Sequence, residues 1–243
     1  MRILVVNDDG INASGILLLA SKLKKYGEVI IVAPNEGRSA ASHSILLKKP
    51  IVFEKVNDIN GIEAYSCSGM PADCVRLATS VIKKQFDIVF SGINDGLNCG
   101  TDIIYSGTVA GAKEAIIEGI PGVSISQDKN YNLKDYEVED LLDYIMENKL
   151  YSTNYVLNVN FPTNDHERSL GYRFCKQGIK SFKTEFFKNN KGYYDEVNIN
   201  ITYDMDPNTD VYLGKMGYTT FVPVGLDQTN HQFVNILKKF ERD

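Results

Sequence analysis

The sequence predicts an α/β fold, in which a mainly parallel sheet is covered by helices on both faces. Three observations lead to this fold class. Short, unbroken apolar runs, typical of strands buried on both faces, recur along the chain. Stretches with helical spacing of apolar residues separate these runs. The first strand, helix and second strand together have the length of one βαβ unit. Alternating strands and helices of this kind favour a parallel sheet.

The first βαβ unit can be followed residue by residue. The apolar run 3–6 is the first predicted strand, and the turn-forming residues Asn-Asp-Asp-Gly at 7–10 end it. A helix is predicted over 15–26, with Gly27 as its C-terminal cap. The second strand covers 29–33 and stops at Pro34.

The same alternation continues to about residue 165. The predicted elements are helix 72–83, strand 87–90, helix 108–118, strand 122–125, helix 136–148 and strand 155–159. Beyond this point apolar and polar residues alternate around a turn at 189–192, which predicts a hairpin, and a last helix is predicted over 232–240. We therefore expect one domain over 1–243, with its core in 1–165 and a hairpin and helix in 166–243. Because a hairpin cannot bury its own apolar residues, it is predicted to be an oligomerisation arm.

Composition and charge exclude several classes of protein. The 243 residues are 43% hydrophobic and 23% charged, which is typical of a globular chain. The net charge of −5 gives no basic footprint for a nucleic-acid polymer, and no apolar run is long enough to span a membrane. The four cysteines have no metal-binding spacing, and the N-terminus does not resemble a signal peptide. We expect a cytoplasmic protein with reduced thiols.

Oxygen-bearing side chains follow several of the predicted strands. Asp8 and Asp9 follow the first, Ser39 follows the second, and Asn94 follows the strand at 87–90. The carboxyl ends of parallel strands meet at one edge of a sheet, where ligands bind. Two adjacent carboxylates favour a cation, and an all-oxygen set suits Mg²⁺ or Mn²⁺. The alternative is that 7–10 is only a tight turn.

A second candidate feature is Ser106-Gly107-Thr108 at the start of a predicted helix. The free N–H groups and the dipole of a helix N-terminus suit a phosphate. The alternative is an ordinary helix cap, because Ser and Thr caps are common. His43 is four residues beyond Ser39 and is a further candidate donor to a phosphate or a leaving group.

Several other classes of protein lack their motifs here. No dinucleotide-binding glycine motif, no Walker A sequence and no nucleophile elbow is present. A receiver-like, Mg²⁺-binding signalling module without hydrolase activity is the non-enzymatic alternative, but the segment 51–56 supplies no phosphoacceptor aspartate. A haloacid-dehalogenase-type phosphatase needs Asp-x-Asp after the first strand, and Asp8-Asp9-Gly10 does not provide it.

Ordered blocks of sequence resemble the SurE family, the survival-protein-E 5′-nucleotidases. The opening Met1–Gly10 is similar to the start of that family, and the later blocks follow in the family's order. These are Arg38-Ser39, 69–75, 91–94, 96–98, 105–109, 157–162, Thr209-Asp210 and Gly217-Tyr218. The resemblance covers nearly the whole chain. It implies a Rossmann-like αβα core and a metal-dependent phosphatase acting on nucleoside 5′-monophosphates, in some members also on 3′-monophosphates and short polyphosphate.

The resemblance also implies roles for individual residues. Asp8, Asp9, Ser39 and Asn94 would hold one divalent metal ion per subunit, and Asn98, Ser106, Gly107 and Thr108 would hold phosphate. Members of the family are dimers or tetramers that exchange C-terminal segments, which agrees with the predicted arm. The mechanism suggested is attack by a metal-activated water that Asp8 or Asp9 orients or deprotonates. A covalent aspartyl-phosphate on Asp8 is left open.

The chain departs from the family pattern at three places. It has Arg38-Ser39-Ala40 where the family usually has Arg-Ser-Gly, and Gly69-Met70-Pro71 where the family has Gly-Thr-Pro. The run Phe221–Val224 also differs from the usual Ser-Ile-Thr-Pro-Leu. No departure removes a proposed metal ligand. The methionine is expected to alter the substrate pocket.

Overall fold

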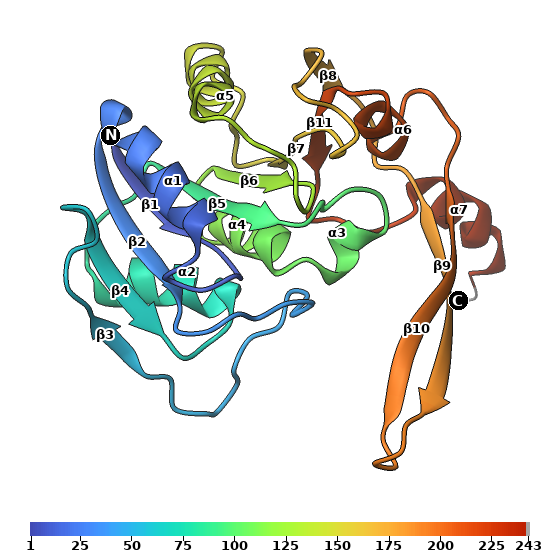
Figure 1. Cartoon of the computed structure of the whole chain (residues 1–243), viewed down its shortest axis with the longest axis horizontal. Coiled ribbons are helices and arrows are strands. Elements are labelled where there is room, and N and C mark those ends of the chain that lie inside the picture. The colour runs from blue at the N-terminus through green and yellow to red at the C-terminus, as the bar shows by residue number, and fades with distance from the viewer. Residues whose placement is uncertain (242–243) are drawn as a thin grey trace.

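A nine-stranded sheet forms the body of the protein in the computed structural model (Figure 1). The structure describes residues 1–241, without the side chains of residues 198 and 199. The strands lie in the order β3-β4-β2-β1-β5-β6-β7-β11-β8. Their bounds are β1 Arg2–Val6, β2 Glu28–Pro34, β3 Phe53–Lys55, β4 Glu63–Cys67, β5 Ile88–Asp95, β6 Gly122–Gln127, β7 Val156–Asn160, β8 Tyr172–Phe174 and β11 Thr219–Val224.

Helices cover both faces of this sheet. Their bounds are α1 Ser14–Leu23, α2 Pro71–Val81, α3 Asp102–Tyr105, α4 Gly107–Ile117, α5 Asp135–Glu147, α6 Asp210–Lys215 and α7 His231–Leu237. Alternate residues of β1 point to opposite layers. Ile3 and Val5 belong to the apolar cluster under α1 and α5, and Leu4 and Val6 to the cluster under α2 and α4. This confirms the predicted three-layer αβα architecture.

The strand order reverses direction between β1 and β5, and in such sheets ligands bind at the carboxyl edge beside the reversal. From β4 through β2, β1, β5 and β6 to β7 all neighbours are parallel. The chain builds outward from β1 in one direction and, after crossing over, from β5 in the other, as in a doubly wound sheet. The connections that follow β1 and β5 therefore separate at the carboxyl edge and leave a crevice there.

The last third of the chain contributes strands to two different sheets. The strands β11 and β8 extend the main sheet, where β11 is antiparallel to β7. The strands β9 Lys180–Lys188 and β10 Tyr194–Tyr203 form a separate antiparallel hairpin. Figure 1 shows this hairpin extending away from the nine-stranded sheet. Its turn lies at the predicted position. Within the described residues no helix is both long and apolar enough to cross a membrane.

The structure contains short elements that the sequence did not predict. These are β3, β4, α3, α6, β8 and β11. The shortest of them, β3 and β8, have three residues each, too few to show a period. In β4 the small and polar residues outnumber the apolar ones. The strand β5 is longer than predicted, because it continues through Ser91-Gly92 with an irregular register against β6.

Candidate active site

Asp8 lies at the end of β1, directly against the N-terminus of α4. Its side chain is 6% exposed, and Thr108 Oγ1 donates a hydrogen bond to its Oδ1. A Cβ on Gly107 would lie 2.8 Å from the Asp8 Cβ, so only glycine allows the helix to approach this closely. The structure therefore brings Asp8 against Gly107 and Thr108, which follow it by about a hundred residues in the sequence.

The start of α4 is both a capped helix and a region of positive potential. Ser106 is its N-cap, and the Ser106 Oγ accepts the Val109 N–H at 3.0 Å. The N–H groups of Gly107 and Thr108 are the first two of the helix and have no acceptor within it. The capping role of Ser106 and an anion-binding role of the residues after it are compatible, because they use different donors.

Asp9 lies on the side of the crevice formed by β5. The Asp95 N–H donates to Asp9 Oδ2 at 3.3 Å, which joins the end of β1 to the end of β5. Asn94 donates from Nδ2 to the Gly96 carbonyl at 2.6 Å, which fixes its amide. That bond uses the nitrogen of the amide and leaves the Asn94 Oδ1 as the atom that can bind a cation.

Ser39 lies in the loop that follows β2. The Arg38 N–H donates to the Asp8 carbonyl at 2.7 Å, so the residue before Ser39 is attached to the end of β1. Ser39 itself is exposed. Ala40 follows it with φ of +53°, in the left-handed region that favours glycine. This conformation gives a physical reason for glycine at the position after the serine.

The two carboxylates carry the electrostatic signature of a cation site. Burial raises the pKa of Asp8 to about 6; the hydrogen bond from Thr108 lowers it and the charge of Asp9 raises it. Burial also raises the pKa of Asp9, against a lowering by the Asp95 amide. Among the described residues no lysine or arginine forms an ion pair with either carboxylate or is a main cause of either shift. One buried and one half-buried carboxylate, neither with a cationic partner in the described part of the chain, fit a divalent ion.

The proposed metal set does not depend on a larger acidic cluster. Among residues 1–241 no group of three or more His, Cys, Asp or Glu side chains is placed to hold a metal. The predicted set has two acids, one hydroxyl and one amide, which are hard oxygen ligands of the kind that Mg²⁺ and Mn²⁺ take.

Asn98 lies in the loop after β5, buried among polar side chains that come from β6 and β7. It is 6% exposed, and its Nδ2 donates to Ser126 Oγ at 2.8 Å. Asn158 and Asn160, which also contact it, were missed by the sequence reasoning. A signal was present, because Asn158 lies between apolar residues in the predicted strand 155–159 and Asn160 follows that strand directly.

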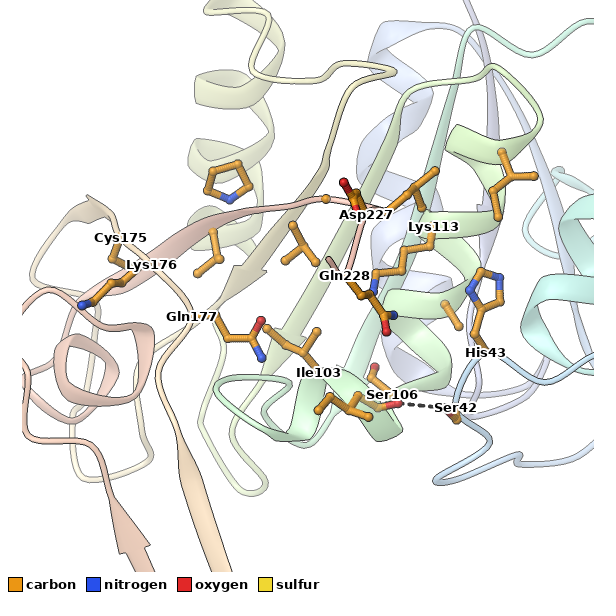
Figure 2. Close-up of a pocket in the computed structure, with 18 residues that line it drawn as sticks. Ser42, His43, Ile103, Ser106, Lys113, Cys175, Lys176, Gln177, Asp227 and Gln228 are labelled. Atoms are coloured by element: carbon orange, nitrogen blue, oxygen red, sulfur yellow. Dashed lines mark hydrogen bonds between the residues drawn. The ribbon is translucent and has the colours of Figure 1, made fainter. Parts of the chain in front are cut away.

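His43 has a carboxylate partner on α4. Its Nε2 lies 2.7 Å from Glu114 Oε2, and Glu114 is 7% exposed. His43 lines a cavity of about 880 Å³, in which Ser106 is the other member of the predicted set. Figure 2 shows His43, Ser106 and Lys113 among the side chains around this cavity. A second cavity, of about 650 Å³, is lined by Asp9 and Asp95. Members of the predicted set thus line two different cavities.

Met70 is the N-cap residue of α2. Its N–H donates to Asp73 Oδ2 at 3.0 Å, so the carboxylate half of a capping box is present. A thioether is a much weaker hydrogen-bond acceptor than the hydroxyl of threonine, so the other half of the box is weaker with Met70. The methionine at this position therefore weakens the N-terminal cap of α2.

Comparison with known proteins identifies consistent relatives. Residues 3–184 match the family described as Survival protein SurE. The 5′-nucleotidase SurE of Clostridium botulinum (strain ATCC 19397 / Type A) is 42% identical, covering 100% of this chain and 98% of the relative. That of C. botulinum (strain Alaska E43 / Type E3) is 40% identical, covering 98% and 99%. The crystal structure of SurE protein from Aquifex aeolicus superposes with a TM-score of 0.82 at 32% identity, covering 100% of both chains.

Proposed function

The chain belongs to the SurE family, and from that premise we propose that it is a metal-dependent phosphomonoesterase that hydrolyses nucleoside 5′-monophosphates to nucleoside and phosphate. The observation that carries this proposal is the contact of Asp8 with the N-terminus of α4. It combines a carboxylate pair for a cation with free N–H groups for a phosphate. The names of the curated relatives, 5′-nucleotidase SurE, support the substrate class. We extend the proposal to 3′-monophosphates and short polyphosphate as further substrates.

The metal ligands proposed are Asp8, Asp9, Ser39 and Asn94, for one Mg²⁺ or Mn²⁺ per subunit. Their support is the buried Asp8 beside the half-buried Asp9, neither with a cationic partner among the residues that the structure describes, and the Oδ1 of Asn94, which the bond to Gly96 leaves for a cation. When bound, such an ion supplies positive charge to the phosphate oxygens and lowers the pKa of a coordinated water.

The chain's own groups have separate tasks around the phosphate. The N–H groups of Gly107 and Thr108, at the positive end of α4, would hold the equatorial oxygens as negative charge develops on them. Asn98 and Ser106 would add side-chain donors. Asp8 or Asp9 would orient the attacking water and take its proton.

We further propose that the chain is a homo-oligomer, a dimer or tetramer, joined through the C-terminal hairpin and helix. Large apolar residues there are exposed in the single chain, among them Phe186 at 62% and Phe240 at 67%. The helix α7 has no buried residue at all. Apolar surface of this kind marks a protein interface.

The test is phosphate release from a panel of 5′- and 3′-mononucleotides, with and without Mg²⁺ or Mn²⁺, by wild type and Asp8→Asn. We expect metal-dependent release that the variant loses by at least about a thousandfold, because both the metal site and the base are removed. Asp87→Asn, a substitution at the opposite end of β5, is the matched control and should retain wild-type turnover. Near wild-type turnover by Asp8→Asn at saturating metal would contradict the assignment. Metal binding without release from any substrate would favour the receiver-like alternative.

A further inference from the structure

Asn98 is held in place by side chains instead of by secondary structure. The carboxamide of Asn160 binds both backbone groups of Asn98: its Oδ1 accepts the Asn98 N–H at 2.7 Å, and its Nδ2 donates to the Asn98 carbonyl at 3.1 Å. Asn158 Nδ2 donates to the same carbonyl at 2.8 Å. The backbone of this one loop residue thus makes three hydrogen bonds with two side chains of β7: it donates one and accepts two.

A second set of bonds fixes the orientation of these amides. Ser124 Oγ donates to Asn158 Oδ1 at 2.8 Å, which directs the Asn158 Nδ2 towards the Asn98 carbonyl. Ser126 Oγ accepts the Asn98 Nδ2 at 2.8 Å. Ser124, Ser126 and Asn158 are fully buried, and Asn160 is 2% exposed. The network is therefore shielded from water, where each hydrogen bond is costly to lose.

From these contacts we infer that Asn158 and Asn160 are positioning residues, which set the location of Asn98 for the substrate phosphate. The inference rests on the proposed function. The network occupies the Asn98 backbone and one Nδ2 hydrogen, and it leaves Oδ1 and the second Nδ2 hydrogen for a ligand. Because the loop is fixed before substrate arrives, the phosphate meets a donor already in place.

The most informative substitutions are Asn160→Asp and Asn158→Asp, because they keep size and shape. In each variant an oxygen replaces the Nδ2 that donates to the Asn98 carbonyl, so that two oxygens face each other and the loop must move. We expect kcat/KM for a nucleoside 5′-monophosphate to fall by about 100-fold, the cost of a displacement of roughly 1 Å. Binding of inorganic phosphate, measured by calorimetry, should weaken in parallel.

A double-mutant cycle with Asn98→Ala distinguishes positioning from general structural support. If Asn160 acts through Asn98, then adding Asn160→Asp to Asn98→Ala should lower kcat/KM by less than about threefold further, and the coupling should be large. If the two losses are additive, Asn160 does not act through Asn98 and the inference is wrong. Equal phosphate affinity in wild type and Asn160→Asp would also overturn it.

Thr220→Val is the matched control. Thr220 lies directly opposite Asn160 on β11, is fully buried, and its Oγ1 has no hydrogen-bond partner among the described residues. The variant should keep the wild-type kcat/KM. If Thr220→Val loses as much activity as Asn160→Asp, the effect reflects disturbance of the sheet edge and the inference fails. Absence of phosphate release by the wild type itself would instead contradict the proposed function.

Discussion

The αβα body, which is the nine-stranded sheet with its covering helices, buries its large apolar residues. The C-terminal arm, which is the β9–β10 hairpin with α7, leaves them exposed. In β1 the four residues from Ile3 to Val6 have no exposed surface. In the arm, Phe187 is 53% exposed, Tyr193 69% and Phe233 54%. Both regions carry large apolar residues, so what differs is whether other elements cover them. The body has helices on both faces of its sheet, and the hairpin has only itself.

This difference separates the two proposed roles. Every residue proposed to bind metal or phosphate lies in the body, between Asp8 and Thr108. The arm has none of them, and its exposed apolar side chains need a partner to be buried. The proposed chemistry therefore uses residues that one chain buries by itself, whereas the proposed assembly would bury apolar residues that one chain leaves exposed.

The largest effect is expected from a charge placed on the arm. Phe187→Glu would bring a carboxylate into the proposed interface and raise the dissociation constant of the oligomer by about 100-fold or more. Analytical ultracentrifugation measures the change. Lys191→Glu, at the turn of the hairpin, is the control and should leave assembly intact. Turnover per subunit should stay within about twofold of wild type. A loss of turnover that follows dissociation would show that body and arm are not separable.

A smaller effect concerns the cost of the buried carboxylate in the body. Because the folded-state pKa of Asp8 is raised from 3.8 to about 6, the folded state holds this proton more tightly than the unfolded chain. Its contribution to the free energy of unfolding is therefore most favourable below about pH 4 and declines as pH rises to about 6. Between pH 4.5 and pH 8 the metal-free wild type should lose about 2 kcal/mol relative to Asp8→Asn.

Urea unfolding of both proteins at pH 4.5 and pH 8, with chelator, measures this loss as the change in their difference. Saturating Mg²⁺ or Mn²⁺ at pH 8 should restore the stability of the wild type alone. A difference that does not change with pH would contradict the raised pKa of Asp8. Phe187→Glu in monomeric form should show the same pH dependence as wild type, since it does not contact the crevice.

The smallest effect is expected at Ala40, where the Cβ atom is sterically strained in the left-handed backbone conformation. Ala40→Gly should raise the free energy of unfolding by about 1 kcal/mol, because the residue has φ of +53°. Ala41→Gly is the control, because Ala41 is not one of the residues with positive φ, so its substitution relieves no strain and only raises the entropy of the unfolded chain. Thermal unfolding of the two variants measures the contrast. Equal destabilisation by both substitutions would show that the strain at Ala40 is relieved elsewhere.

The sequence predicts best what depends on one chain segment at a time. The β1 strand and the turn that carries Asp8 and Asp9 are predicted by local composition, and the position of the hairpin turn likewise. What depends on a distant partner was not predictable. Asn158 and Asn160 are visible as polar residues in a buried strand, but no pattern tells which loop they bind. His43 is close to Ser39 in sequence, yet its partner, Glu114, is chosen by packing against α4.

The asparagines of β7 also have a consequence for how the sheet forms. Asn158 and Asn160 share one face of the strand, and Leu157 and Val159 share the other, where they join the apolar cluster with α1 and α5. A slip of one residue would turn both amides into that apolar layer and leave the Asn98 backbone facing hydrocarbon. A β7 strand paired out of register is therefore destabilised twice, by amides buried in the apolar layer and by the lost hydrogen bonds of Asn98. The residues that hold a loop in the finished protein thus also act during folding as a check on strand alignment.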